Sequence, residues 1–355
     1  MRLPSWSLCA AFSSDLMHVF LPVIDCGPFL VEELKRAGIA ATEDAVTGLI
    51  HAPALPELPW LAFARQTLPE ATEVKEASIN AWADHIITRI AGILPDAQPW
   101  RLHLWPAYGE GKAGLHRCDL IRTALNERLK KRRRALLRSL EESAAAFSPE
   151  TSLVQAVLTG PDAGFVSVSA APQPSELRAL ISPFLGGDVP HAEDKAAPSR
   201  AFAKVIESEL RLGQQIESGQ TCVDLGASPG SWSYVAIQRG AYVTAIDRSP
   251  LRDDLMRNPR LSFQQADAFK FRPEQPVDWL ICDIIAAPQR SLDLLMDWLR
   301  ERQMRRFIVT LKFKGSDEYH LMDALKELAP PLCADFRLTR LCANKNEVTA
   351  FGVVA

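Results

Sequence analysis

Aspartate recurs at the apolar runs in the C-terminal half of the chain, where it could serve ligand binding. Asp247, Asp267 and Asp283 each end such a run, and Asp224 lies within a fourth. At one rim of a parallel sheet, Asp247 could accept hydrogen bonds from a ribose diol and Asp267 from an adenine amino group. A single aspartate there could equally be a helix N-cap, but the set favours a ligand site.

A loop with two glycines follows the apolar run Thr221 to Leu225. It reads Gly226-Ala227-Ser228-Pro229-Gly230-Ser231-Trp232 and leads into an apolar helical segment. Because glycine has no Cβ, the backbone can pass close to a ligand. The spacing is not G-x-G-x-x-G, which disfavours NAD and indicates another adenosine-bearing cofactor. Alone, the loop could be an ordinary tight turn.

Two lysines and a glutamate stand where an ionised side chain is unusual. Lys312 ends the apolar run Ile308 to Leu311, Lys204 lies on a helix before the glycine loop, and Glu347 begins the last apolar run. Burying an ammonium is costly unless it is paired. A lysine that reaches solvent along an apolar surface is the simpler alternative for any one of them.

The elements that would position these side chains alternate between strand and helix, which predicts an α/β fold with a Rossmann-like sheet. A helix is expected over Pro198 to Leu212. Strands are expected at Thr221–Leu225, Ala241–Ile246, a run ending near Phe263–Phe269, Trp279–Ile284, Phe307–Lys312, Phe336–Cys342 and Glu347–Val354.

The C-terminal half resembles S-adenosylmethionine-dependent methyltransferases. Lys204, Asp283, Lys312 and Glu347 match the tetrad of FtsJ-type RNA ribose 2′-O-methyltransferases. Further segments are similar to the large-subunit rRNA cytidine 2′-O-methyltransferase M family. They are Ala197–Arg200, Val223–Trp232, Asp267–Pro273 and Asn346–Thr349. The match is dense over residues 198–355 and thin over 1–172.

The resemblance implies methyl transfer from S-adenosylmethionine to a ribose 2′-oxygen, with a cytidine of 23S rRNA as target. It places the cofactor against Ser199, Asp224, Gly226, Ala227, Pro229, Gly230, Ser231, Trp232, Asp247, Asp267 and Asp283. Lys312 is expected to be the base, Lys204 and Asp283 its electrostatic partners, and Glu347 a positioning group. Desolvation and Lys204 favour the neutral Lys312 amine, whereas Asp283 and Glu347 oppose it.

Two loop residues depart from the family pattern, and three rival functions have to be weighed. Ser231 replaces a glycine and Ser228 a cysteine, without removing a catalytic group. A non-catalytic RNA-binding protein would not need the tetrad. A base N-methyltransferase would show an Asn/Asp-Pro-Pro-aromatic loop, whereas Asp283 is followed by Ile-Ile-Ala-Ala-Pro. Methylation of another structured RNA is the remaining alternative.

The resemblance also predicts how the chain is divided. We expect a ferredoxin-like module at residues 1–75, a THUMP-like RNA-binding domain at 76–172, a linker at 173–198 and the methyltransferase domain at 199–355. Within the second part, a long helix over Leu120 to Leu140 carries Lys130, Lys131, Arg132, Arg133 and Arg134. These five residues, termed the basic run, are either a solvated helix face or a contact with RNA phosphates.

The amino-acid composition limits the kinds of partner that the chain is expected to bind. The chain has 355 residues, 47% of them hydrophobic, and a formal net charge of −3, so no overall basic field favours nucleic acid. Its seven cysteines form no C-x-x-C pair, which suits a reducing cytoplasm, and no metal-binding spacing is visible. No run has the length of a signal peptide or membrane span. We expect the partner to be 23S rRNA before subunit assembly is complete; the oligomeric state is left open.

Overall fold

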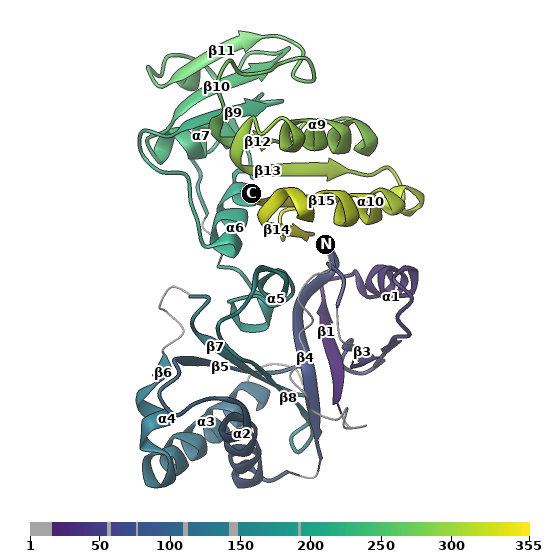
Figure 1. The fold of residues 1–355 in the computed structure, drawn as a ribbon, viewed down its shortest axis with the longest axis vertical. Helices are drawn as coiled ribbons and strands as arrows, with labels where there is room; N and C mark the ends of the chain where they lie inside the picture. Colours follow the sequence, from purple (N-terminus) through teal and green to yellow (C-terminus); the bar gives the residue numbers. More distant parts are fainter. Residues whose placement is uncertain (1–15, 55–57, 76, 109–112, 142–147, 191–192) are drawn as a thin grey trace. The chain divides into compact units, whose positions relative to one another are not determined.

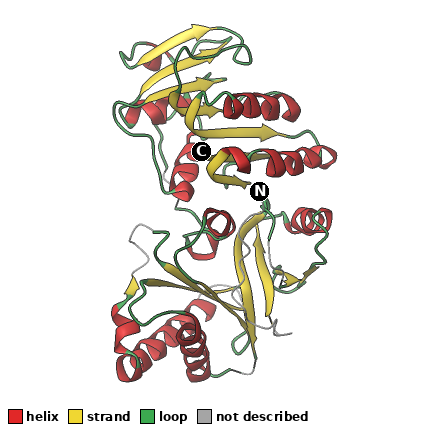
Figure 2. Ribbon diagram, in the orientation of Figure 1, coloured by secondary structure: helices red, strands yellow, loops and turns green. Residues whose placement is uncertain are grey.

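The computed structural model describes residues 16–54, 58–75, 77–108, 113–141, 148–190 and 193–355. The chain divides into two compact units, one ending at Asp188 and the other beginning at Val189. Each unit is built on its own sheet, with eight strands in the first and seven in the second. Figure 2 shows helices packed beside both sheets.

The first unit has strand order β2-β3-β1-β4-β8-β7-β5-β6. Its strands are β1 (Leu16–Pro22), β2 (Thr42–Glu43), β3 (Ile50–Pro53), β4 (Ala64–Val74), β5 (Trp100–Pro106), β6 (Leu140–Glu141), β7 (Ser152–Leu158) and β8 (Gly164–Ser169). Its helices are α1 (Gly27–Arg36), α2 (Ile79–Ile93), α3 (Ala113–Arg132), α4 (Arg134–Arg138), α5 (Ser175–Leu180) and the 3-10 turn η1 (Leu185–Gly187).

One hydrophobic core joins α2 and α3 to this sheet, with Trp82 and Trp100 fully buried in it. The strand β4 pairs with β8, so the sheet is continuous across the two N-terminal parts that the sequence predicts. Their description as a ferredoxin-like module and a THUMP-like domain stays a prediction.

One local expectation for this unit was wrong. The long basic helix is two helices, since Arg133 leaves the helical region with φ −145° and ψ 58° between α3 and α4. Before β3 the chain turns, because the Asp44 carboxylate accepts hydrogen bonds from the backbone of Val46 and Thr47.

The second unit has strand order β11-β10-β9-β12-β13-β15-β14. Its strands are β9 (Thr221–Leu225), β10 (Tyr242–Asp247), β11 (Leu261–Gln265), β12 (Val277–Cys282), β13 (Met304–Lys312), β14 (Cys333–Thr339) and β15 (Glu347–Val354). Its helices are α6 (Phe202–Leu212), α7 (Ser231–Gln238), α8 (Asp253–Met256), α9 (Pro288–Arg300) and α10 (His320–Leu328), with 3-10 turns η2 (Ser316–Tyr319) and η3 (Pro330–Leu332).

This second sheet is the predicted Rossmann-like arrangement. Strands β9 to β13 run parallel, and β15 is antiparallel to both of its neighbours. In Figure 1, α6 and α7 cover one face of the sheet and α9 and α10 the other. After β9, the next two strands, β10 and β11, extend the sheet on one side of β9. The chain then crosses to the other side of β9, where β12 and β13 lie. The glycine loop after β9 therefore lies at the switch point, where such sheets bind ligands.

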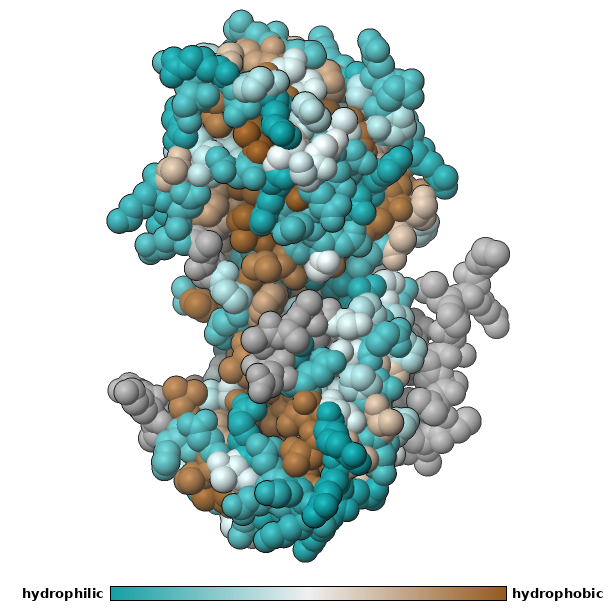
Figure 3. Space-filling view, turned by 90° about the vertical axis from the view of Figure 1, so that its left-hand side faces the viewer, coloured by the Kyte–Doolittle hydropathy of each residue, from teal (hydrophilic) through white to brown (hydrophobic). Residues whose placement is uncertain are grey.

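Side-chain polarity agrees with this layering. Trp279 and Trp298 are completely buried in the second unit, on a strand and a helix that pack into its core. On the face drawn in Figure 3, hydrophilic residues cover most of the surface, with hydrophobic residues showing between them. Among the described helices, none is long and apolar enough to cross a membrane.

Candidate active site

Lys204, Asp283, Lys312 and Glu347, from four separate elements, meet in one cluster, termed the tetrad. Lys204 Nζ lies 3.1 and 3.2 Å from the two carboxylate oxygens of Asp283 and 2.5 Å from Glu347 Oε1. Lys312 Nζ lies 3.0 Å from Asp283 Oδ1 and 4.0 Å from Glu347 Oε2. Its ammonium also donates to the Asp283 carbonyl oxygen at 2.8 Å. The structure thus brings together the four residues that the sequence singles out.

Strand register explains why the tetrad converges. Lys312, the last residue of β13, is directly opposite Glu347, the first residue of β15. Asp283 follows β12, the neighbour of β13 on its other side. Lys204 comes from the first turn of α6, whose start is fixed by a hydrogen bond from Trp232 Nε1 to the Ala201 carbonyl oxygen.

Burial separates the two lysines of the tetrad. The Lys204 side chain is 5% exposed and that of Lys312 is 23% exposed. Burial raises the pKa of Glu347, but the hydrogen bond and positive charge of Lys204, with help from Asn344 and Lys312, outweigh it and lower that pKa overall. Two cations and two carboxylates leave the cluster neutral, which is how buried charges are tolerated. Lys204 is therefore a buried structural ion, and Lys312 is the lysine that a substrate can reach.

A pocket of about 480 Å³ runs from the glycine loop to the tetrad, a size suited to a small ligand. Asp283 and Lys312 lie in its wall. Ten of the residues predicted to bind the cofactor also line it: Ser199, Asp224, Gly226, Ala227, Pro229, Ser231, Trp232, Asp247, Asp267 and Asp283. The eleventh, Gly230, is the N-cap residue of α7 and does not line the pocket.

The loop glycines are required by backbone conformation and packing. Gly226 has φ 76° and Gly230 has φ 110°, both in the left-handed region that favours glycine. A Cβ on Gly226 would come within 2.5 Å of Ile284, and one on Gly230 within 2.3 Å of Leu255. The sequence argument attributed both glycines to a close ligand, whereas side chains of this chain already occupy the space beside them.

Backbone donors hold two of the acidic side chains at the pocket wall. Asp247 accepts from the amides of Ser228 and Ser249, at 3.0 and 2.8 Å. Asp267 accepts from the Phe269 amide at 3.1 Å, and that bond is the main reason its pKa is lowered. The two carboxylates are thus held in fixed orientations, as binding a ribose diol or an adenine amino group requires.

Asp224 differs from these two because it is completely buried. Burial raises its pKa to about 7; hydrogen bonds from the Ser233 amide and hydroxyl oppose the shift, and the charges of Asp283 and Asp247 add to it. A carboxyl group with such a pKa loses its proton, and so becomes negatively charged, near neutral pH. A positively charged ligand group in the pocket would favour the charged form.

Ser231, the loop serine that replaces a family glycine, has a hydrogen-bond partner. The Ser231 hydroxyl is 2.7 Å from that of Ser199, and both residues line the pocket. This contact links the start of α7 to the segment before α6. The serine therefore fits the structure without blocking the pocket.

Sequence reasoning missed other residues of the pocket wall. All except Ala201, which precedes α6, lie in the loop after a strand or in the first turn of the helix that follows it, so that position was the available signal. The missed residues are Ala201, Ser228, Arg248, Ala266, Ala268, Phe269, Ile284, Ile285, Ala286 and Arg290. Within the described residues, no group of histidine, cysteine, aspartate and glutamate side chains could hold a metal ion.

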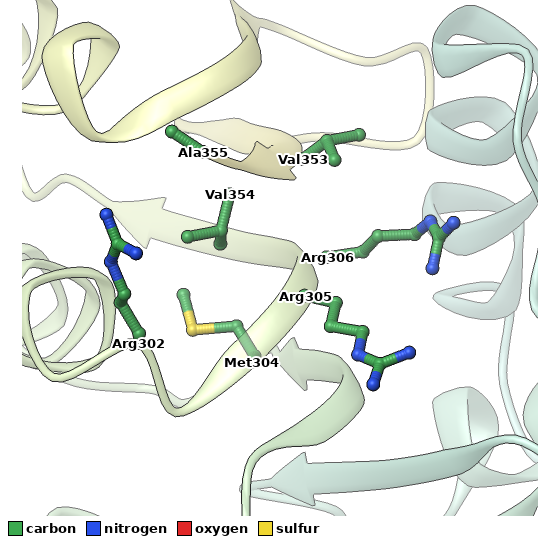
Figure 4. A pocket seen from close by; sticks show the side chains of 7 residues that line it. All are labelled: Arg302, Met304, Arg305, Arg306, Val353, Val354 and Ala355. Atoms are coloured by element: carbon green, nitrogen blue, oxygen red, sulfur yellow. The ribbon is translucent and has the colours of Figure 1, made fainter.

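A second hollow of about 380 Å³ lies at the opposite edge of the same sheet. Figure 4 shows its lining of Arg302, Met304, Arg305, Arg306, Val353, Val354 and Ala355. Met304 begins β13 and Lys312 ends it, so strand rise puts the hollow about 25 Å from the tetrad. Arg305 pairs with Asp278 at 3.5 Å, and Arg306 donates to Gln214 at 2.6 Å. We therefore assign the chemistry to the first pocket.

The basic run belongs to the first unit and lies around the junction of α3 and α4. All five of its side chains are exposed. Arg133 lies 3.4 Å from Asp96 and Arg132 lies 3.9 Å from Asp84. The run is thus accessible to a polyanion, and its role stays a prediction.

Comparison with known proteins supports the resemblance over the second unit. The model of the FtsJ-like methyltransferase family matches residues 197–329. Ribosomal RNA large subunit methyltransferase M of Thauera aminoaromatica is 36% identical over 166 residues, which cover 44% of this chain and 46% of that protein. The protein of the same name from Halorhodospira halophila is 44% identical over 119 residues, 33% of this chain and 35% of its own length. The matched part of the chain thus spans about half the length of these relatives or less.

Proposed function

We propose that this chain, whose residues 197–329 match the FtsJ-like methyltransferase family, methylates the ribose 2′-oxygen of a cytidine in 23S rRNA with S-adenosylmethionine. The observation that carries the proposal is the tetrad at the end of a pocket already suited to an adenosine-bearing ligand. Asp247 and Asp267 offer fixed acceptors at the pocket wall, and Asp224 is poised to stabilise a cationic group. The residues present therefore fit this cofactor.

Within this proposal, Lys312 removes the proton from the 2′-hydroxyl. S-adenosylmethionine, when bound, supplies an electrophilic methyl group and a positive charge. Lys312 Nζ lies 3.0 Å from the Asp283 carboxylate and 2.8 Å from the Asp283 carbonyl oxygen, contacts that hold it at the pocket wall. The 2′-oxygen gains the methyl group that the cofactor gives up and loses its proton, and Lys312 Nζ takes that proton as a neutral amine, having first released its own ammonium proton to solvent.

The other tetrad residues hold Lys312 in place. Lys204 engages Asp283 through both carboxylate oxygens and Glu347 at 2.5 Å, which balances their charges. Asp283 contacts both lysines and so fixes their separation. Glu347 faces Lys312 across the strand pair and acts as a positioning group. A non-catalytic RNA-binding protein would have no use for this arrangement.

The proposal extends to where RNA binds. We assign RNA affinity to the first unit, as a ferredoxin-like module followed by a THUMP-like domain, with the basic run contacting phosphates. The substrate is cytoplasmic 23S rRNA before subunit assembly is complete. Phosphate contacts release counterions, so RNA affinity should fall steeply with salt.

Changing Lys130 and Lys131 to glutamate tests the RNA assignment. Both are exposed, and neither is among the arginines that pair with Asp84 or Asp96. The double variant should lose RNA affinity and show a flatter salt slope while cofactor binding is retained. Parent affinity with the parent salt slope would exclude the basic run.

Mapping of 2′-O-methyl groups on rRNA from cells with and without this chain tests the function itself. One methylated nucleotide in 23S rRNA should disappear when the chain is removed and return with the wild-type gene, but not with a Lys312→Ala gene. Unchanged maps would refute the proposed function.

A further inference from the structure

Three cationic side chains line the pocket that holds the tetrad, and one of them differs from the others. Arg248 lies 3.3 Å from the Asp267 carboxylate and Lys312 lies 3.0 Å from that of Asp283. Arg290, by contrast, makes no ion pair with any carboxylate of the residues that the structure describes. A cation at a pocket wall with its charge uncompensated is available for an anionic ligand.

The Arg290 guanidinium is held in place by an aromatic ring. It lies 3.8 Å from the centroid of the Phe269 ring, in a cation–π contact, and Phe269 also lines the pocket. Stacking of this kind uses the flat face of the guanidinium. The N–H donors lie in the guanidinium plane, so they stay free for a planar or bidentate acceptor such as a phosphate.

An apolar side chain accompanies Arg290 on the same stretch of chain. Ile285, two residues after Asp283 on the loop between β12 and α9, is 90% exposed and lines the pocket. A single exposed isoleucine needs no explanation on an ordinary surface. Beside a candidate active site, it provides an apolar contact for the base or sugar of a nucleotide.

We propose that Arg290 binds the phosphate next to the ribose that is methylated, and that Ile285 packs against the adjoining nucleoside. The inference rests on the proposed function and adds residues that position the RNA. In a ribonucleotide, the 3′-phosphate is attached to the carbon next to the one that bears the 2′-hydroxyl. A cation in the same pocket as Lys312 is therefore well placed to hold that phosphate while Lys312 faces the hydroxyl.

The test compares Arg290→Ala, Arg290→Lys and Ile285→Ser with wild type, using unmodified 23S rRNA transcribed in vitro. Arg290→Ala should raise KM for the RNA about tenfold while kcat and S-adenosylmethionine affinity stay within about twofold. Removal of one phosphate contact should also flatten the salt slope of RNA affinity by about 0.7 to 0.9. Arg290→Lys should recover part of the KM because it keeps the charge without the planar donors. Ile285→Ser should raise KM severalfold without changing the salt slope.

Arg300→Ala is the matched control. Arg300 is exposed at the other end of the same helix α9, about 15 Å away by helix rise. It should behave as wild type. Equal KM and salt slope in Arg290→Ala and Arg300→Ala would overturn the inference, as would a loss of cofactor affinity in Arg290→Ala that matches its loss of RNA affinity. If wild type itself transfers no methyl group, the proposed function fails, and this inference fails with it.

Discussion

Replacing Lys204 by methionine removes the cation on which Glu347 depends. Asp283 keeps Lys312 at 3.0 Å, whereas Glu347 keeps the Lys345 amide at 3.3 Å and, as its nearest cation, a lysine 4.0 Å away. The Glu347 side chain is 9% exposed, so the variant leaves a nearly buried carboxylate without a close cation. Breaking a buried ion pair in this way costs about 3–5 kcal/mol. We expect a loss of that size in the second unit at pH 8.

The loss should depend on pH in a defined direction. In wild type the pKa of Glu347 is lowered, so its contribution to stability is present above the unfolded-state pKa and is lost as pH falls. Without Lys204, burial dominates and raises that pKa above the unfolded value. The variant then loses stability as pH rises from the unfolded-state pKa to the raised pKa of Glu347. Between the raised pKa and the unfolded-state pKa, each unit by which the pH falls restores about 1.4 kcal/mol.

Hydrogen exchange under increasing urea, followed on β13 and β15 at pH 5.5 and pH 8, measures this loss within the second unit. Lys314→Met is the matched control, because Lys314 is exposed two residues beyond Lys312 and should change stability by less than about 0.5 kcal/mol. Lys204→Met combined with Glu347→Gln should lose less than the sum of the two single changes. An Lys204→Met loss no larger than that of the control, or one that is the same at both pH values, would refute the reasoning.

Two further predictions concern the pocket. Asp247→Ala should weaken S-adenosylmethionine binding by about 1–3 kcal/mol in calorimetry, since ligand donors would lose their acceptor; unchanged affinity would exclude a ribose contact. Asp224→Asn keeps an acceptor for Ser233 but removes a carboxyl group whose pKa of about 7 exceeds the ordinary value of 3.8, so wild type should lose stability as pH rises from 3.8 to about 7 while the variant does not. Parallel pH profiles in denaturation experiments would contradict the assigned pKa.

The fold of the second unit could be predicted from the sequence because most of its strands are short apolar runs with a charged residue at or beside one end. Asp247 ends one strand and Asp283 follows another, and parallel strands bring their carboxyl ends to one edge. The opposition of Lys312 and Glu347 could not be derived from spacing, because register depends on how β15 pairs between β13 and β14. The resemblance to a known tetrad supplied that pairing instead.

Contacts between side chains distant in sequence were beyond sequence reasoning. Arg290 is one of several arginines on or near α9, and only its position over Phe269 sets it apart. The break at Arg133 was missed as well, since Lys130 to Arg134 are good helix formers and the pattern predicts one continuous helix.

Methyl transfer to unmodified 23S rRNA by purified wild type and Lys312→Ala tests the central claim most directly. General-base catalysis contributes about 10²–10⁴-fold, so the variant should lose at least about a hundredfold in rate with cofactor affinity near that of wild type. The wild-type product should carry the methyl group on a ribose 2′-oxygen, which protects the adjoining phosphodiester from alkaline hydrolysis. Transfer by Lys312→Ala at the wild-type rate, or a methyl group on a base, would contradict the account.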